Sequence, residues 1–163
     1  MKRTPWVLLL ALFLCAVCFS NGVSALLTSF GVALPFPGYL SSVVLFAVAG
    51  VLLYLGLKLK WYMQECEERR EKPTSAPRKH EIDMTTAAKT VAFATACALA
   101  GAMAGGVFSG EVLFLLVSAE VSFTGALLPT LLAAISGIVL SGIGYLVEGW
   151  GEVPPEPGGN ARA

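Results

Sequence analysis

Residues 101–110 read GAMAGGVFSG, which places four glycines, two alanines and a serine inside a long apolar run. In water, each glycine weakens a helix by about 1 kcal/mol relative to alanine. In lipid, helices gain nothing by hiding large apolar side chains from each other, and they associate where small residues let their backbones approach. The stretch is therefore typical of a membrane helix that packs closely against other helices.

The composition of the whole chain also indicates that it is surrounded by lipid. Of its 163 residues, 56% are hydrophobic and 13% are charged, whereas soluble domains have about 25% charged residues. A soluble domain of this size could not hide so much apolar surface from water. Eleven Lys and Arg residues balance eleven Asp and Glu residues, which argues against nucleic-acid binding because that needs a basic face.

Four apolar runs have the length of about 20 residues that crosses the hydrocarbon of a bilayer. The predicted fold class is all-α, an integral membrane bundle of four transmembrane helices in two hairpins with cytoplasmic N- and C-termini. The predicted domain is 1–150, and a Pro/Gly-rich tail at 151–163 is expected to be disordered. The spans are about 5–27, 39–61, 86–117 and 127–147, with a charged cytoplasmic linker at 62–85.

The basic residues indicate the orientation. All eleven Lys and Arg lie at 2–3, in 58–89 or at 162, and the other two linkers contain none. Four spans place these segments on one side, and basic residues collect on the cytoplasmic side. Trp6, Trp61, Tyr62 and Trp150 fall at the same span ends, where aromatic rings favour the headgroup zone. We expect a multi-pass protein of the plasma (cell) membrane.

The first span has an alternative interpretation. Residues 1–25 combine a basic start, an apolar stretch and a small-x-small ending at Val23-Ser24-Ala25, as in a cleavable signal peptide. Cleavage would leave three spans in the same orientation. With Leu26 and Leu27, however, the apolar stretch is long enough to span, and we favour a retained helix.

Small residues recur at period four in two spans and are the candidate helix-packing residues. We expect the third and fourth helices to pack along these positions, or one strip to serve self-association; the alternative is that small residues are simply common in membrane helices. The strips of the third span are Ala98, Ala102, Gly106 and Gly110, and Gly101, Gly105 and Ser109; the fourth span has Ala133, Gly137 and Ser141.

Candidate chemistry is sparse, so we expect no enzyme, no catalytic residues, no cofactor and no metal site. Cys15 and Cys18 have the CxxC spacing, but hydrocarbon disfavours the thiolate that redox chemistry needs. His80 is the only histidine. Glu111 and Glu148 fall near span ends, where a solvated role at the boundary is favoured over proton coupling. The EERREK stretch at 67–72 is interpreted as a solvated charge run, with a helical extension of the second span as the alternative.

With this layout, the chain resembles the small four-span membrane proteins of actinobacteria grouped as domain-of-unknown-function family 3180. The resemblance rests on an MKRT lead-in, an ALPFPG turn, the run AAKT continuing into ALAGAMAGGVFSGEVLFLL, and the acidic, Pro-rich ending YLVEGWGEVPPEP. Glu148-Gly149-Trp150 departs from the basic end of the fourth span expected in members. The resemblance implies a retained first helix and a bacterial plasma membrane, and it implies no activity.

Two classes of function follow from these features. The first is a non-enzymatic structural or accessory protein that packs with other membrane proteins; its partners are the lipid bilayer and other membrane proteins or a second copy. The alternative is a small oligomeric transporter or channel, which predicts a polar pore face. The span hydroxyls, however, are scattered, at Ser41, Ser42, Thr90, Thr95, Ser136 and Ser141.

Overall fold

The computed structural model describes residues 4–32, 37–71, 84–118 and 124–151. Within these ranges the chain forms four helices and no strand: α1 (Trp6–Ser29), α2 (Tyr39–Glu71), α3 (Met84–Ser118) and α4 (Thr124–Trp150). Each helix is long and apolar enough to cross a membrane. The predicted all-α class with four spans is confirmed.

The second helix is longer than its predicted span. The 33 residues of α2 cover about 50 Å at about 1.5 Å per residue, which exceeds the roughly 30 Å of hydrocarbon. The helix extends beyond the predicted span through most of the EERREK stretch, as far as Glu71. Several features named above lie outside the described residues: part of the ALPFPG turn, at 33–36, the linker residues 72–83 with His80, and the tail at 152–163.

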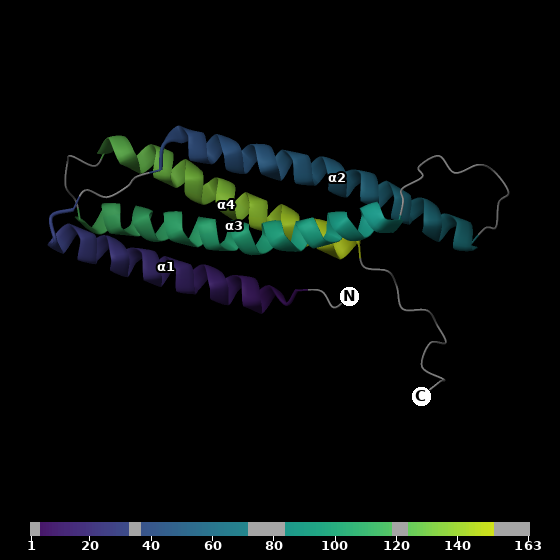
Figure 1. The fold of residues 1–163 in the computed structure, drawn as a ribbon, viewed down its shortest axis with the longest axis horizontal. Coiled ribbons are helices and arrows are strands. Elements are labelled where there is room, and N and C mark those ends of the chain that lie inside the picture. Colours follow the sequence, from purple (N-terminus) through teal and green to yellow (C-terminus); the bar gives the residue numbers. More distant parts are fainter. Residues whose placement is uncertain (1–3, 33–36, 72–83, 119–123, 152–163) are drawn as a thin grey trace, which may run out of the picture.

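The bundle is built around a central pair, α3 and α4, as Figure 1 shows. α1 packs on α3 and α2 packs on α4, so that the order across the bundle is α2, α4, α3, α1. Consecutive helices run in opposite directions, as hairpins require. The first hairpin is open, however, because α1 and α2 lie on opposite sides of the central pair and do not pack on each other.

Glycine ends the first helix. Gly31 has φ of 68°, a conformation that costs little only for glycine. The amide of Val32 donates to the Leu27 carbonyl at 3.0 Å and that of Phe30 to the Leu26 carbonyl at 3.2 Å. These bonds satisfy carbonyls that the last helical turn would otherwise leave unpaired.

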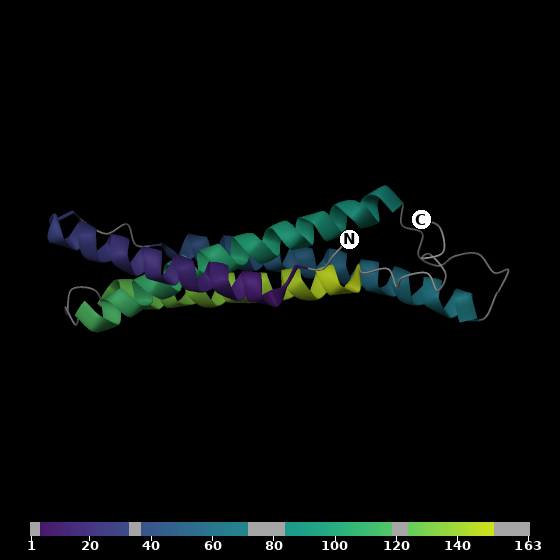
Figure 2. The same cartoon turned by 90° about the horizontal axis from the view of Figure 1, so that it is seen from below.

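Two features identify one end of the bundle, which we call the tryptophan end because Trp6 and Trp150 lie there. Thr4, just before α1, donates hydrogen bonds to Glu148 near the end of α4. Lys60 of α2 lies 5.0 Å from the centre of the Trp150 ring. In Figure 2 the beginning of α3 rises away from α4 at this end, so the helices cross at an angle.

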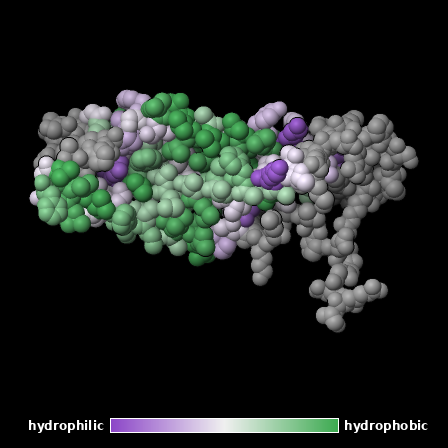
Figure 3. All heavy atoms as spheres, viewed as in Figure 1, coloured by the Kyte–Doolittle hydropathy of each residue, from purple (hydrophilic) through white to green (hydrophobic). Residues whose placement is uncertain are grey.

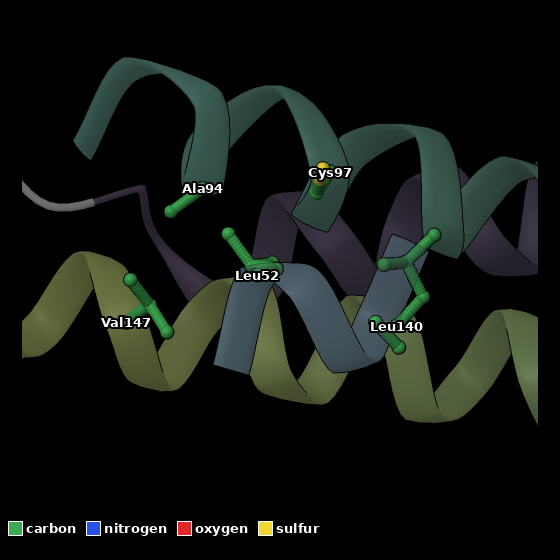
Figure 4. Packing of buried hydrophobic residues seen from close by; sticks show 6 residues of the cluster. Leu52, Ala94, Cys97, Leu140 and Val147 are labelled. Carbon is green, nitrogen blue, oxygen red and sulfur yellow. The ribbon is translucent and has the colours of Figure 1, made fainter. Parts of the chain in front are cut away.

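The surface and the core are both apolar. Figure 3 shows hydrophobic residues over the middle of the visible face, with hydrophilic ones towards the tryptophan end. Inside, Leu52 of α2 lies among Ala94 and Cys97 of α3 and Leu140 and Val147 of α4, as Figure 4 shows. All five belong to one buried cluster. This cluster joins α2 to the central pair.

The packing of α1 predicts that residues 1–25 remain part of the mature protein. Removing them would uncover the glycine face of α3 that α1 covers and would break the bonds to Glu148. The intact mass of the protein purified from membranes should therefore include these residues, apart from processing of the initiator methionine. A mass lower by residues 1–25 would contradict this expectation.

Candidate functional site

The most distinctive geometry of the molecule is the contact between α3 and α4. A Cβ atom built on Gly101 would lie 2.5 Å from the Ser141 amide nitrogen and 2.8 Å from the Gly137 carbonyl oxygen. A Cβ on Gly137 would lie 2.5 Å from the Gly105 nitrogen. These backbone atoms leave no room for a side chain, so glycine sets the separation of the two helices.

The same contact continues towards the tryptophan end. A Cβ on Gly144 would lie 2.6 Å from the Ala98 nitrogen and 2.8 Å from the Ala94 carbonyl oxygen. Ala98 of α3 is fully buried, and so is Ala133 in the first half of α4. Small residues therefore line the facing sides of α3 and α4 over most of their shared length.

Gly106 and Gly110, the last two residues of the first strip of α3, face α1. A Cβ on Gly106 would lie 2.6 Å from the Phe13 carbonyl oxygen, and a Cβ on Gly110 would lie 2.6 Å from that of Val17. The Ser20 hydroxyl donates to the Val107 carbonyl oxygen at 2.8 Å. Close backbones and an interhelical hydrogen bond thus hold α1 on α3, as is common between helices in lipid.

The sequence-predicted packing residues divide between these two interfaces. Gly101, Gly105, Gly137 and Ser141 meet between α3 and α4, and Ala98 lies against Gly144 there. Gly106 and Gly110 instead meet α1. The remaining three are Ala102, in a buried cluster with Leu9 and Ala98; Ala133, fully buried; and Ser109, half-buried.

The period-four pattern of α3 did not predict that α1 would be the partner of Gly106 and Gly110. The signal was present, because Ala16, Ser20 and Ser24 follow one another at period four in the first span. Ser20 and Ser24 are buried in the structure. In this fold α1 covers Gly106 and Gly110 within the same chain, so this part of the strip is not free for a second copy.

The glycines also offer polar contacts of their own. The direction of a missing Cβ is the direction of the second Hα atom, and it leads to carbonyl oxygens of facing helices at five glycines. A Cα–H···O contact of this kind contributes about 0.5–1 kcal/mol. Gly101 and Gly137 each face the other's carbonyl oxygen, and the other three contacts are Gly106 with Phe13, Gly110 with Val17, and Gly144 with Ala94.

Glu148 differs from the expectation of a solvated boundary residue. It is only 7% exposed, and its Oε1 accepts hydrogen bonds from the Thr4 amide at 2.7 Å and the Thr4 hydroxyl at 2.8 Å. The first turn of α1 has no acidic residue of its own. Glu148 therefore brings a carboxylate to the N-terminus of α1, where the helix dipole favours negative charge.

The other side chains considered as candidates for chemistry are Glu111 and the cysteines, and they do not form a shared site. Glu111 is half-buried, with its Oε2 buried and without a hydrogen-bond partner. Cys15 and Cys18 are exposed free thiols on α1, and Cys97 is buried. Within the described residues, no group of three or more His, Cys, Asp or Glu side chains could hold a metal ion.

Comparison with known proteins places the chain in a family. A family model described as protein of unknown function (DUF3180) matches residues 6–155. The chain belongs to this family. The match covers all four helices, α1 included. No curated protein and no solved structure matches the chain.

Changing Gly137 to alanine tests the interface between α3 and α4. We expect Gly137→Ala to lower the free energy of unfolding by about 1–3 kcal/mol, because the new methyl group would overlap the Gly105 backbone. Unfolding in mixed micelles by SDS titration measures this loss. Gly142→Ala is the matched control, since Gly142 lies on α4 with no atom within 4 Å of its missing Cβ. Equal losses in the two variants would contradict the assigned contact.

Thr4 and Glu148 should behave as a coupled pair. We expect Glu148→Ala to destabilise the docked start of α1 by about 1.5–3 kcal/mol, and Thr4→Val, which keeps the amide bond, by about 0.5–1.5 kcal/mol. Hydrogen exchange in the first turns of α1 reports both changes. The double variant should lose less than the sum of the two. Strict additivity would show that the two residues act separately.

Proposed function

We propose that this chain is a non-enzymatic structural or accessory protein of the plasma membrane that packs with other membrane proteins. The observation that carries the proposal is the backbone contact of α3 with α4 and α1, which fills the middle of the bundle with helix backbone. This arrangement suits a rigid unit that presents its outer faces to neighbours.

The buried hydroxyls favour the same role over transport through the single chain. Thr130 donates to the Ala126 carbonyl oxygen at 2.7 Å, and Ser136 donates to that of Ala133 at 2.8 Å. Both of these bonds lie within α4. The Ser20 hydroxyl of α1 donates instead to a carbonyl oxygen of α3. These hydroxyls satisfy helix carbonyls and do not form a polar path. A pore between copies in an oligomer remains the alternative.

The outer face of α2 offers a site for another membrane helix. Ala47, Gly50 and Tyr54 follow at spacings of three and four, and all three are exposed. No atom lies within 4 Å of the missing Cβ of Gly50. Small exposed residues permit the close approach on which helix association in lipid depends, and the Tyr54 hydroxyl adds a hydrogen-bonding group.

For the orientation, we propose that the tryptophan end faces the cytoplasm, because Lys58, Lys60 and Lys89 lie in the α2 and α3 segments near that end. In a cysteine-free background, Gln64→Cys should react with an impermeant maleimide only after intact cells are permeabilised. Phe30→Cys, exposed at the opposite end, should react in intact cells. The reverse pattern would overturn this orientation.

The accessory role predicts a stoichiometric partner protein. We would purify the chain in native-lipid nanodiscs and identify bound proteins by intact-particle mass spectrometry. Gly50→Leu should weaken partner binding about 5- to 150-fold and so reduce partner recovery, since overpacking a close interface costs about 1–3 kcal/mol. Val44→Leu, at an exposed position on the same helix, is the matched control and should retain the partner.

Two results would contradict the accessory role. One is the absence of any stoichiometric partner together with solute flux in liposomes that contain only this chain, which would favour the transporter. The other is a protein recovered equally with both variants, which would mark it as a bystander of the purification.

A further inference from the structure

Glu111 of α3 is a carboxyl group that the packing of the bundle leaves without a partner. Its side chain is half-buried, and its Oε2 atom is buried with no hydrogen-bond partner among the described residues. It interrupts an otherwise apolar stretch of α3. A charged carboxylate enclosed in this way is costly unless it is paired, so its depth in the membrane and the charges around it decide its state.

The contact with α1 fixes the depth of this carboxyl group. The neighbouring Gly110 meets the Val17 carbonyl oxygen and the Ser20 side chain, so Glu111 is level with this part of α1. Ser20 follows Trp6 by 14 positions, or about 21 Å of helix. Since Trp6 marks the tryptophan end and hydrocarbon is about 30 Å thick, Glu111 lies inside the hydrocarbon, roughly 10 Å from its far boundary. This is deeper than the boundary position expected from the sequence.

Exposed apolar side chains beyond this level support the same depth. Leu113, Leu116 and Val117 follow Glu111 on α3 and are all exposed, and so is Leu26 towards the end of α1. A surface of this kind faces lipid rather than water. The hydrocarbon therefore continues for more than one helical turn past the carboxyl group.

The chain offers no basic residue that lies near Glu111. Residues 4–57 and 90–161 contain no Lys or Arg, and these ranges include every segment that follows or precedes a helix at the end opposite the tryptophan end. On α3 itself the basic residue is Lys89, 22 positions away, or about 33 Å along the helix. A negative charge on Glu111 would therefore have no counter-charge from this chain inside the hydrocarbon.

The other titratable groups on the surrounding helices cannot replace a basic residue. Thiols and phenols carry either no charge or a negative one, so none of them balances a carboxylate. Glu148 is acidic as well and lies at the tryptophan end, bonded to Thr4. The thiols and phenols are Cys15 and Cys18 of α1, Tyr39 and Tyr54 of α2, Cys97 of α3 and Tyr145 of α4.

We propose that Glu111 is a proton-binding site, which takes up a proton from water beyond the end of the bundle opposite the tryptophan end and holds it as a neutral carboxylic acid inside the hydrocarbon. The proton comes from a hydronium ion and leaves a water molecule, so no other reactant is needed. The proposal goes beyond the accessory role, since the proton binds whether or not another protein packs on α2.

A proton suits this site better than a metal cation or a basic residue of another protein. The Oε2 atom is covered by the chain itself, so a ligand from outside does not reach it. Within the described residues, no group of three His, Cys, Asp or Glu side chains could hold a metal ion. A proton on Oε1 leaves Oε2 as the oxygen of a neutral carbonyl group, for which a missing hydrogen bond costs far less than for a carboxylate.

Infrared spectroscopy of the full chain in lipid vesicles tests the proposal, because carboxylic acids and carboxylates absorb at different frequencies. At pH 7, exposed acidic side chains are ionised. We expect Glu111→Gln to remove a carboxylic-acid band and to leave the carboxylate absorption unchanged. Ser109→Ala, at a half-buried position of the same helix, is the control and should change neither.

Loss of carboxylate absorption in Glu111→Gln, with the carboxylic-acid region unchanged, would overturn the proposal. It would indicate that an outside cation, from a salt or from another protein, balances Glu111. Neither result bears on the α2 partner, whose recovery is measured separately.

A second measurement needs no variant and so does not depend on the folding of Glu111→Gln. Solid-state NMR of the unaltered chain in lipid bilayers, with ¹³C at the glutamate carboxyl carbon, distinguishes an acid from a carboxylate by chemical shift. After assignment, the Glu111 resonance should have the shift of a carboxylic acid at pH 7. A carboxylate shift at this pH would overturn the proposal.

Discussion

Backbone contact at the glycines of α3 is the constraint on which the rest of this structure depends. In lipid, burying leucine against leucine gains little, and close packing supplies most of the attraction between helices. Gly101 and Gly105 admit the α4 backbone on one flank of α3, and Gly106 and Gly110 admit α1 on the other. α2 then packs on α4 through larger side chains such as Leu52 and Val147, and it is left on the far side of the central pair.

The sequence predicts where the four helices lie along the chain better than it predicts which helices contact each other. Apolar runs define the four helices because hydrocarbon demands about 20 apolar residues per crossing, and the strips of α3 are visible as period-four repeats. Which helix covers which strip depends on matched surfaces, and the sequence gives no direct measure of these. The contact of α1 with Gly106 and the burial of Glu148 against Thr4 both join residues far apart in the chain. Charge content alone could not reveal that the start of α1 and the end of α4 meet.

The position of each helix in the bundle follows from this packing. α3 has small residues on two flanks and is therefore the centre, whereas α1 and α2 each use one side within the bundle and leave the other to the membrane. These two outward faces carry the polar groups Asn21 and Tyr54 beside small residues. A rigid interior with two faces of this kind is what we would expect of a family member whose role lies in contacts with other membrane helices.

The most direct test of the central contact is solid-state NMR of the protein in lipid bilayers with ¹³C at glycine Cα only. After sequential assignment, the spectrum should contain a strong through-space cross-peak between Gly105 of α3 and Gly137 of α4, because a Cβ on Gly137 would lie only 2.6 Å from the Gly105 Cα. Such a peak between residues on different helices requires their backbones to touch. Its absence from a well-resolved spectrum would contradict the glycine-mediated packing.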